Sequence, residues 1–116
     1  MASVLLVDDN QDILDSMTEG MEMFGIDVVG QAVNGEEGIK EFEKSNPDVI
    51  ILDIMMPDYD GFYFLDKIRK SDSKVKIIVV SGDVKEETSE KLEKYELLGR
   101  FSKPVKFGEI TDLINS

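Results

Sequence analysis

The chain lacks the two side chains on which many enzymes and metal sites depend. Its 116 residues include no cysteine and no histidine. Without cysteine there are no disulfide bonds, no thiolate catalysis and no cysteine-ligated zinc. Without histidine there is neither Ser–His nor Cys–His catalysis, nor any histidine-ligated metal. A bound metal ion must therefore have oxygen ligands, which suits Mg²⁺, Mn²⁺ and Ca²⁺.

Positive charge is scarce as well. The 13 lysine and arginine residues face 25 aspartate and glutamate residues, so the net charge is −12. This charge repels nucleic acid and anionic membrane surfaces, and it attracts cations. Long apolar stretches are missing, and the N-terminal residues have neither the basic region nor the cleavage site of a signal peptide. We therefore expect a cytoplasmic protein that binds neither nucleic acid nor a membrane directly.

The length is that of one globular domain. The sequence shows no internal repeat, low-complexity tract or linker. A chain of 116 residues can bury one hydrophobic core without needing disulfide bonds or a structural metal for stability. We expect a single domain over residues 1–116.

Short aliphatic segments alternate with segments of helical periodicity. Residues 4–7, 49–52 and 77–80 are purely aliphatic, which is typical of parallel strands buried on both faces. Residues 28–33 and 100–102 are more mixed and are predicted to be edge strands. Helical spacing predicts a helix after each strand. The apolar positions are Ile13, Leu14, Met17, Met21 and Phe24; Ile39 and Phe42; Phe64, Leu65 and Ile68; Val84, Thr88, Leu92 and Tyr95; and Phe107, Ile110, Leu113 and Ile114.

This alternation predicts an α/β fold with right-handed crossovers and a parallel sheet. Five such units form a three-layer (βα)5 sandwich. The strand order 2-1-3-4-5 places the two mixed strands at the edges, and it is the order of flavodoxin-like proteins.

Polar residues follow each aliphatic strand. Asp8 and Asp9 follow the strand at residues 4–7, Asp53 follows the strand at 49–52, and Ser81 and Gly82 follow the strand at 77–80. Lys103 follows the weaker strand at residues 100–102. Ligands of open parallel sheets bind beyond the carboxyl ends of the strands. Each residue alone is better explained by a helix cap, a loop or the solvated surface. Their joint placement at one sheet edge favours a functional site.

Three neighbouring carboxylates need a counter-charge. Mg²⁺ supplies one, since it takes one or two carboxylates, several waters and phosphate oxygens. An aspartate can also act as a nucleophile and form an aspartyl phosphate. Phosphoryl transfer needs mainly positioning and charge neutralisation, which acids, a lysine and a hydroxyl provide. Gly82 has no side chain that would block a phosphoryl oxygen.

Four segments together resemble one known family. They are residues 4–10 (VLLVDDN), 53–61 (DIMMPDYDG), 81–82 (SG) and 103–104 (KP). In this order and spacing they resemble the receiver domains of two-component response regulators, the family of CheY. The resemblance covers essentially the whole chain.

The resemblance implies a role for each site residue. Asp53 would accept the phosphoryl group, and Ser81, Gly82 and Lys103 would bind its oxygens. The Lys103–Pro104 peptide bond would be cis, which X–Pro bonds tolerate. Mg²⁺, or Mn²⁺ in its place, would be bound by Asp8 (largely through water), Asp9, Asp53 and the backbone carbonyl of Met55.

The resemblance also implies partners and kinetics. The donor would be a phosphohistidine on a sensor histidine kinase or a phosphotransfer protein. A downstream protein would bind the face formed by the fourth helix, fifth strand and fifth helix. The domain would catalyse its own phosphorylation and autodephosphorylation without turning over an external substrate. Met55 and Asp83 occupy positions that tune the hydrolysis rate.

One position departs from the family pattern. Three residues before the lysine the family usually has tyrosine or phenylalanine, whose rotamer couples to the hydroxyl residue, but this chain has Arg100. Either Arg100 takes the switch position, or a shifted register brings Phe101 there, or Arg100 is an edge-strand surface residue. Our hypothesis is that Arg100 moves between nearby acidic residues as Ser81 moves.

Three alternatives stay open. A phosphotransferase of the haloacid-dehalogenase type would need a second aspartate two residues after the nucleophile, where this chain has Met55. A degenerate receiver would act as an interaction module without phosphorylation, which the intact acids, Ser81 and Lys103 disfavour. The chain could also be the receiver part of a longer regulator with a DNA-binding output domain.

Overall fold

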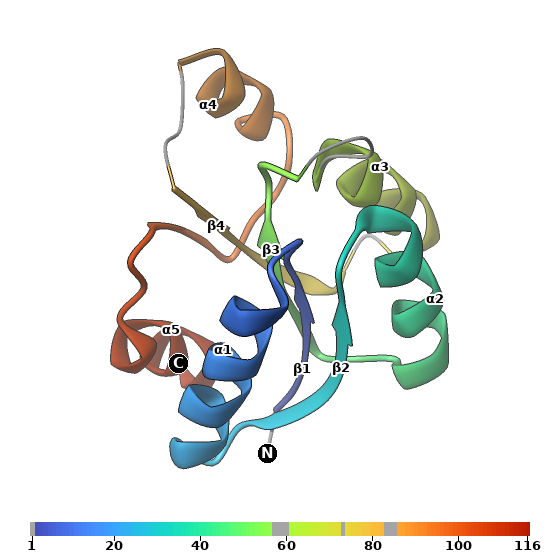
Figure 1. The fold of residues 1–116 in the computed structure, drawn as a ribbon. Coiled ribbons are helices and arrows are strands. Elements are labelled where there is room, and N and C mark those ends of the chain that lie inside the picture. The colour runs from blue at the N-terminus through green and yellow to red at the C-terminus, as the bar shows by residue number, and fades with distance from the viewer. Residues whose placement is uncertain (1, 57–60, 73, 83–85) are drawn as a thin grey trace.

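The computed structural model describes residues 2–56, 61–72, 74–82 and 86–116. Strands and helices alternate from one end to the other (Figure 1). The strands are β1 (Ser3–Val7), β2 (Asp27–Ala32), β3 (Val49–Asp53), β4 (Lys76–Ser81) and β5 (Gly99–Ser102). The helices are α1 (Gln11–Met23), α2 (Gly35–Ser45), α3 (Gly61–Ser71), α4 (Glu86–Leu92) and α5 (Phe107–Asn115).

All five strands are parallel and form one sheet in the order β2-β1-β3-β4-β5. This confirms the predicted order. The three aliphatic strands β1, β3 and β4 are central, and in register Leu5 pairs with Ile50 and Ile50 with Ile77. Helices cover both faces of these strands, so polar and apolar residues do not alternate along them.

Alternate strand residues enter two separate hydrophobic cores. Leu5, Ile50 and Ile77 pack with side chains of α2 and α3 on one face of the sheet. Leu6 and Ile51 pack with side chains of α1 and α5 on the other face. Figure 1 shows the same division, with α1 and α5 on one side of the sheet and α2 and α3 on the other. The predicted three-layer sandwich is therefore confirmed.

Two ends of predicted helices differ from the structure. Phe24 follows α1 as its C-terminal cap and is 53% exposed, so it does not join the apolar stripe of that helix. The fourth helix ends at Leu92 and does not continue to Tyr95. The hydroxyl of Tyr95 instead donates to Asp66 of α3, and its ring lies beside that of Phe62. The predicted position Val84 lies outside the described residues.

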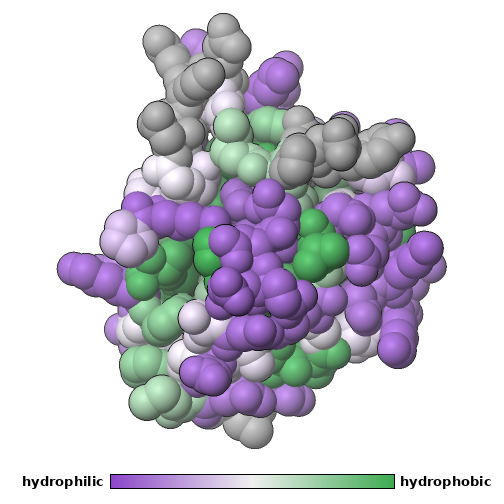
Figure 2. Space-filling model, viewed as in Figure 1, coloured by the Kyte–Doolittle hydropathy of each residue, from purple (hydrophilic) through white to green (hydrophobic). Residues whose placement is uncertain are grey.

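The surface agrees with the high share of charged residues, which is 33%. The face in Figure 2 is mostly hydrophilic, and hydrophobic residues form only separate small areas on it. No helix in the described part of the chain is long and apolar enough to cross a membrane.

Candidate functional site

The polar residues that end the central strands meet at one edge of the sheet. Asp8 directly follows β1, Asp53 ends β3 and Ser81 ends β4. The ligand oxygens of Asp8, Asp9 and Asp53 lie within 4.8 Å of one another. Asp8 and Asp53 are buried, whereas Asp9 is exposed. The structure thus brings together the three carboxylates that the sequence placed at the ends of two different strands.

Backbone amides hold the two buried carboxylates in place. Asp8 accepts a hydrogen bond on Oδ1 from the amide of Asn10 at 2.9 Å. Asp53 accepts one on Oδ1 from the amide of Met55 at 3.0 Å. Each carboxylate therefore keeps Oδ2 for other partners, and both groups are oriented before any ligand binds.

Asn10 has a role that our sequence reasoning missed. Its side chain caps α1 by accepting hydrogen bonds from the amides of Asp12 and Ile13. An asparagine directly before a helix is a strong N-cap signal, so the sequence did contain this information. Because its own amide bonds Asp8, the cap couples the start of α1 to the acid site.

Lys103 bridges the two buried acids. Its Nζ lies 2.9 Å from Oδ2 of Asp8 and 3.3 Å from Oδ2 of Asp53. Its backbone amide donates to the carbonyl of Ser81 at 2.8 Å, which fixes the start of the loop after β5. The bond between Lys103 and Pro104 is cis, as the resemblance implied.

The electrostatics of the site favour a further cation. Burial raises the pKa of Asp53, and this outweighs the lowering by the Met55 amide and by the ammonium group of Lys103. Burial would lower the pKa of Lys103, but its hydrogen bonds and charge interactions with Asp8 and Asp53 raise it overall. The lysine stays protonated, yet the single positive charge of its ammonium group does not neutralise the negative charge of three carboxylates. Hard oxygen ligands with excess negative charge suit Mg²⁺ or Mn²⁺.

The raised pKa of Asp53 leads to a prediction about stability without metal. A carboxyl group with a higher pKa in the folded protein contributes stability at low pH, and this contribution is lost as the pH rises through the folded-state pKa. Asp53→Asn should therefore unfold less readily than the unmodified protein at pH 7 in EDTA, by about 1 kcal/mol. The difference should shrink as the pH falls below the pKa of Asp53. Urea unfolding across this pH range measures it, and a less stable variant at pH 7 would contradict it.

Ser81 offers a buried hydroxyl without a partner. Its Oγ is fully buried and makes no hydrogen bond within the described residues. A buried polar group without a partner is costly, and it often marks a functional position. A Cβ built on the neighbouring Gly82 would meet nothing within 4 Å, so the chain beside this hydroxyl is uncrowded.

Arg100, rather than Phe101, lies on the same sheet face as Ser81. In register, Arg100 pairs with Val79 and Phe101 with Val80. Phe101 packs into the core beside α1 and α5. A cavity of about 230 Å³ lies on the sheet face that carries Ser81 and Arg100. The residues that line it are Val79, Ser81, Ser89, Leu92, Arg100, Phe101 and Ser102.

The described partner of Arg100 is a hydroxyl, not a carboxylate. Its Nη2 donates to Oγ of Ser89 on α4 at 2.8 Å. Among the acidic side chains that the structure describes, which exclude those of Glu86 and Glu87, none lies within ion-pair distance of Arg100. The bond joins the edge strand to α4 across the cavity that Ser81 lines.

Some predicted site residues are placed only in part. The side chain of Met55 is 47% exposed, and its amide contacts Asp53 as described above. Asp83 lies outside the described residues, and so does the segment 57–60 of the motif.

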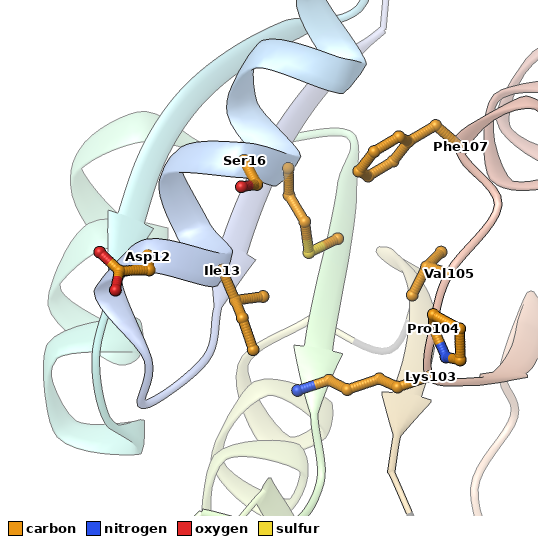
Figure 3. Close-up of a pocket in the computed structure, with 8 residues that line it drawn as sticks. Asp12, Ile13, Ser16, Lys103, Pro104, Val105 and Phe107 are labelled. Carbon is orange, nitrogen blue, oxygen red and sulfur yellow. The ribbon is translucent and has the colours of Figure 1, made fainter.

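A larger cavity adjoins the acid site between α1 and the segment after β5 (Figure 3). Its volume is about 540 Å³, and Lys103 stands at its edge with its amino group turned toward the acids. Sequence reasoning did not find it, because its two walls are far apart in the chain. The lining residues are Asp12, Ile13, Ser16, Met17, Lys103, Pro104, Val105 and Phe107.

Comparisons with known sequences agree with this geometry. Residues 4–115 match the model of the response regulator receiver domain. The nitrate/nitrite response regulator protein NarL of Escherichia coli K12 is 39% identical over 87 residues, which is 74% of this chain and 40% of that protein. A probable transcriptional regulator, ycf27 of Guillardia theta, is 46% identical over 83 residues, or 70% of this chain and 32% of that protein. The chain thus spans well under half the length of these curated relatives.

Solved structures show the same fold over nearly the whole chain. A CheY-like response regulator receiver domain protein from Methanospirillum hungatei superposes with a TM-score of 0.90 at 29% identity, covering 99% of this chain and 91% of that one. CheY in a CheX–CheY–BeF3–Mg²⁺ complex from Borrelia burgdorferi superposes with a TM-score of 0.87 at 25% identity, covering 97% and 86%.

Proposed function

Because this chain belongs to the response regulator receiver domains of two-component systems, we propose that it accepts a phosphoryl group on Asp53 in a Mg²⁺-dependent reaction. The observation that carries the proposal is the buried carboxylate of Asp53, within 4.8 Å of two further acids and bridged by Lys103. The relative from Borrelia burgdorferi was crystallised in a complex with Mg²⁺ and BeF3, which is in keeping with this proposal.

The proposed step is a phosphoryl transfer between two groups. An oxygen of the Asp53 carboxylate attacks phosphorus, and the bond from phosphorus to the donor atom breaks. With a phosphohistidine donor, the electron pair of the broken P–N bond returns to the imidazole. Lys103 neutralises charge on one phosphoryl oxygen, and the hydroxyl of Ser81 donates to another. Asp8, Asp9, Asp53 and the carbonyl of Met55 would hold Mg²⁺, which supplies further charge neutralisation.

We assign the remaining roles by the same reasoning. The donor is a sensor histidine kinase or a phosphotransfer protein, and the apolar cavity beside Lys103 offers it a contact surface (Figure 3). The downstream target binds the face of α4, β5 and α5, and the protein acts in the cytoplasm. Met55 and Asp83 tune hydrolysis of the phosphorylated state. The domain modifies itself and turns over no external substrate.

A small phosphodonor tests the proposal directly. The protein is incubated with acetyl phosphate, with and without Mg²⁺, and its intact mass is measured. A Mg²⁺-dependent adduct of one phosphoryl group is expected. No adduct together with no Mg²⁺ binding would overturn the proposal in favour of an unphosphorylated interaction module. Repeated turnover of a phosphate ester would instead point to a phosphotransferase.

The bond between Arg100 and Ser89 is the proposed link from the site to α4. Among the described side chains of α4 only Leu92 is buried, so this helix has few other contacts that hold it. Removing one hydrogen bond of about 1 kcal/mol should raise amide exchange in α4 about fivefold in Arg100→Ala. Ser89→Ala should give the same increase, and the double variant no more than either.

Hydrogen exchange measured with and without acetyl phosphate checks this link. If Arg100 moves with Ser81, phosphorylation already breaks the hydrogen bond between Arg100 and Ser89. The substitutions should then raise amide exchange in α4 less in the phosphorylated protein than in the unphosphorylated one. Lys106→Ala, an exposed cation outside the contact, is the matched control. Unchanged exchange of α4 in both states would contradict the role of Arg100.

A further inference from the structure

Positive charge gathers at one place in this acidic chain. Residues 67–76 contain five of the 13 cationic residues and one of the 25 acidic residues. Two of them, Arg69 and Lys70, lie in the last turn of α3, where they stabilise the helix dipole. Lys74 and Lys76 lie beyond the helix, so the dipole does not explain them.

Arg69 is held rigidly at the centre of this segment. Its Nη1 donates to the carbonyl of Val75 at 2.8 Å and more weakly to that of Asp72 at 3.4 Å. Its Nη2 donates to the carbonyl of Glu96 at 2.6 Å, in the loop between α4 and β5. A bound group would therefore meet a preorganised guanidinium, which loses little side-chain entropy.

The guanidinium still has donors to offer. Of its five N–H groups, three are used by the carbonyls, which leaves Nε–H and one N–H on Nη2. Nε is buried and has no partner within the described residues. Nε and Nη2 lie on one edge of the guanidinium, and such an edge can bind a carboxylate with two hydrogen bonds.

A groove lies beside this guanidinium, with a volume of about 370 Å³. It sits at the end of the sheet opposite to the acid site, because Lys76 begins β4 and Ser81 ends it. The residues that line it are three cations, one acid and three aliphatic residues: Arg69, Lys74, Lys76, Glu96, Val75, Leu97 and Leu98.

The lining combines charge with apolar surface. No carboxylate whose side chain the structure describes forms an ion pair with its three cations. Leu97 and Leu98 are only partly buried. The groove therefore offers excess positive charge next to aliphatic side chains, and its size lies within the range of about 300–1,000 Å³ typical of ligand sites.

We propose that this groove binds a short segment of a partner protein in which carboxylates alternate with aliphatic side chains. The carboxylates pair with the cations at the rim, and an aliphatic side chain covers Leu97 and Leu98. A peptide with few charges is favoured over nucleic acid, because the net charge of −12 repels a long polyanion. None of the acid-site residues lines this groove.

Three synthetic peptides test the groove by NMR titration of the ¹⁵N-labelled protein. The probe is acetyl-Glu-Leu-Glu-Leu-Glu-amide, and the comparison peptides replace every Glu with Gln or every Leu with Ser. The first peptide should shift the amide signals of Arg69, Lys74, Val75, Leu97 and Leu98. Both comparison peptides should bind about tenfold more weakly, because each lacks one of the two contacts.

Matched variants distinguish the effect of the groove on peptide affinity from the effect of the protein's net charge. Lys74→Gln with Lys76→Gln should weaken the first peptide about tenfold, whereas Lys40→Gln with Lys44→Gln on α2 changes the net charge equally and should leave it unchanged. Equal binding by both double variants, or by the Glu and Gln peptides, would overturn the proposal. Tighter binding of an eight-nucleotide single-stranded DNA at the same amides would assign the groove to nucleic acid instead.

Discussion

Replacing Asp53 with asparagine should abolish phosphoryl transfer from acetyl phosphate. The amide of asparagine is not a nucleophile of comparable strength, and the substitution removes one carboxylate from the acid cluster that could hold Mg²⁺. The fold should survive, because the Oδ1 of asparagine can still accept the hydrogen bond from the amide of Met55. The loss would then report chemistry and not unfolding.

Intact mass measures the result, and the matched control is Asp112→Asn. Asp112 is an exposed acid on α5, so its substitution changes the net charge equally and leaves the site untouched. The control should acquire one phosphoryl group in the presence of Mg²⁺, and Asp53→Asn none. An adduct of equal yield in Asp53→Asn would move the acceptor to another residue, with Asp8 or Asp9 as the first candidates.

Mg²⁺ should stabilise the protein, and Asp9→Asn should remove most of this effect. A ligand that binds only the folded state adds about 2.7 kcal/mol to the free energy of unfolding at a concentration one hundred times its Kd. Asp9 is the exposed member of the acid cluster, so its substitution opens no cavity in the core. Asp8 is less suitable for this test, because it also pairs with Lys103 and Asn10.

Urea unfolding at constant ionic strength, with MgCl₂ or NaCl, checks the second prediction. Asp12→Asn is its control, since Asp12 is an exposed acid close by in the first turn of α1 but outside the cluster. The unmodified protein and the control should gain equally from Mg²⁺. An equal gain in Asp9→Asn would show that the ion binds without this carboxylate.

The sequence predicted best those features of the structure that a single physical cause, such as burial on both faces, imposes on consecutive residues. The strands at residues 4–7, 49–52 and 77–80 lack polar residues because both faces are buried, and this also placed them at the centre of the sheet. Parallel strands carry their carboxyl ends to one edge. The meeting of Asp8, Asp9 and Asp53 could therefore be predicted before any contact was known.

Contacts between distant segments could not be predicted in this way. The apolar spacing that includes Tyr95 indicates a longer fourth helix, but its hydroxyl binds Asp66, which is 29 positions away. The clamp of Arg69 on the carbonyl of Glu96 joins residues 27 positions apart. Helical propensity is a local property, so it cannot anticipate a partner brought near only by folding.

The sequence by itself determined the fold class, the division into central and edge strands and the members of the acid site, because burial and strand direction act along the local chain. The tertiary structure alone decided that Arg100 shares the face of Ser81 and reaches Ser89, that Lys103 bridges Asp8 and Asp53, and that Ser81 is left without a partner. The reason is physical. Strand register and the approach of distant side chains depend on how all layers pack together, and a shift of one residue would have turned Phe101 to the other face.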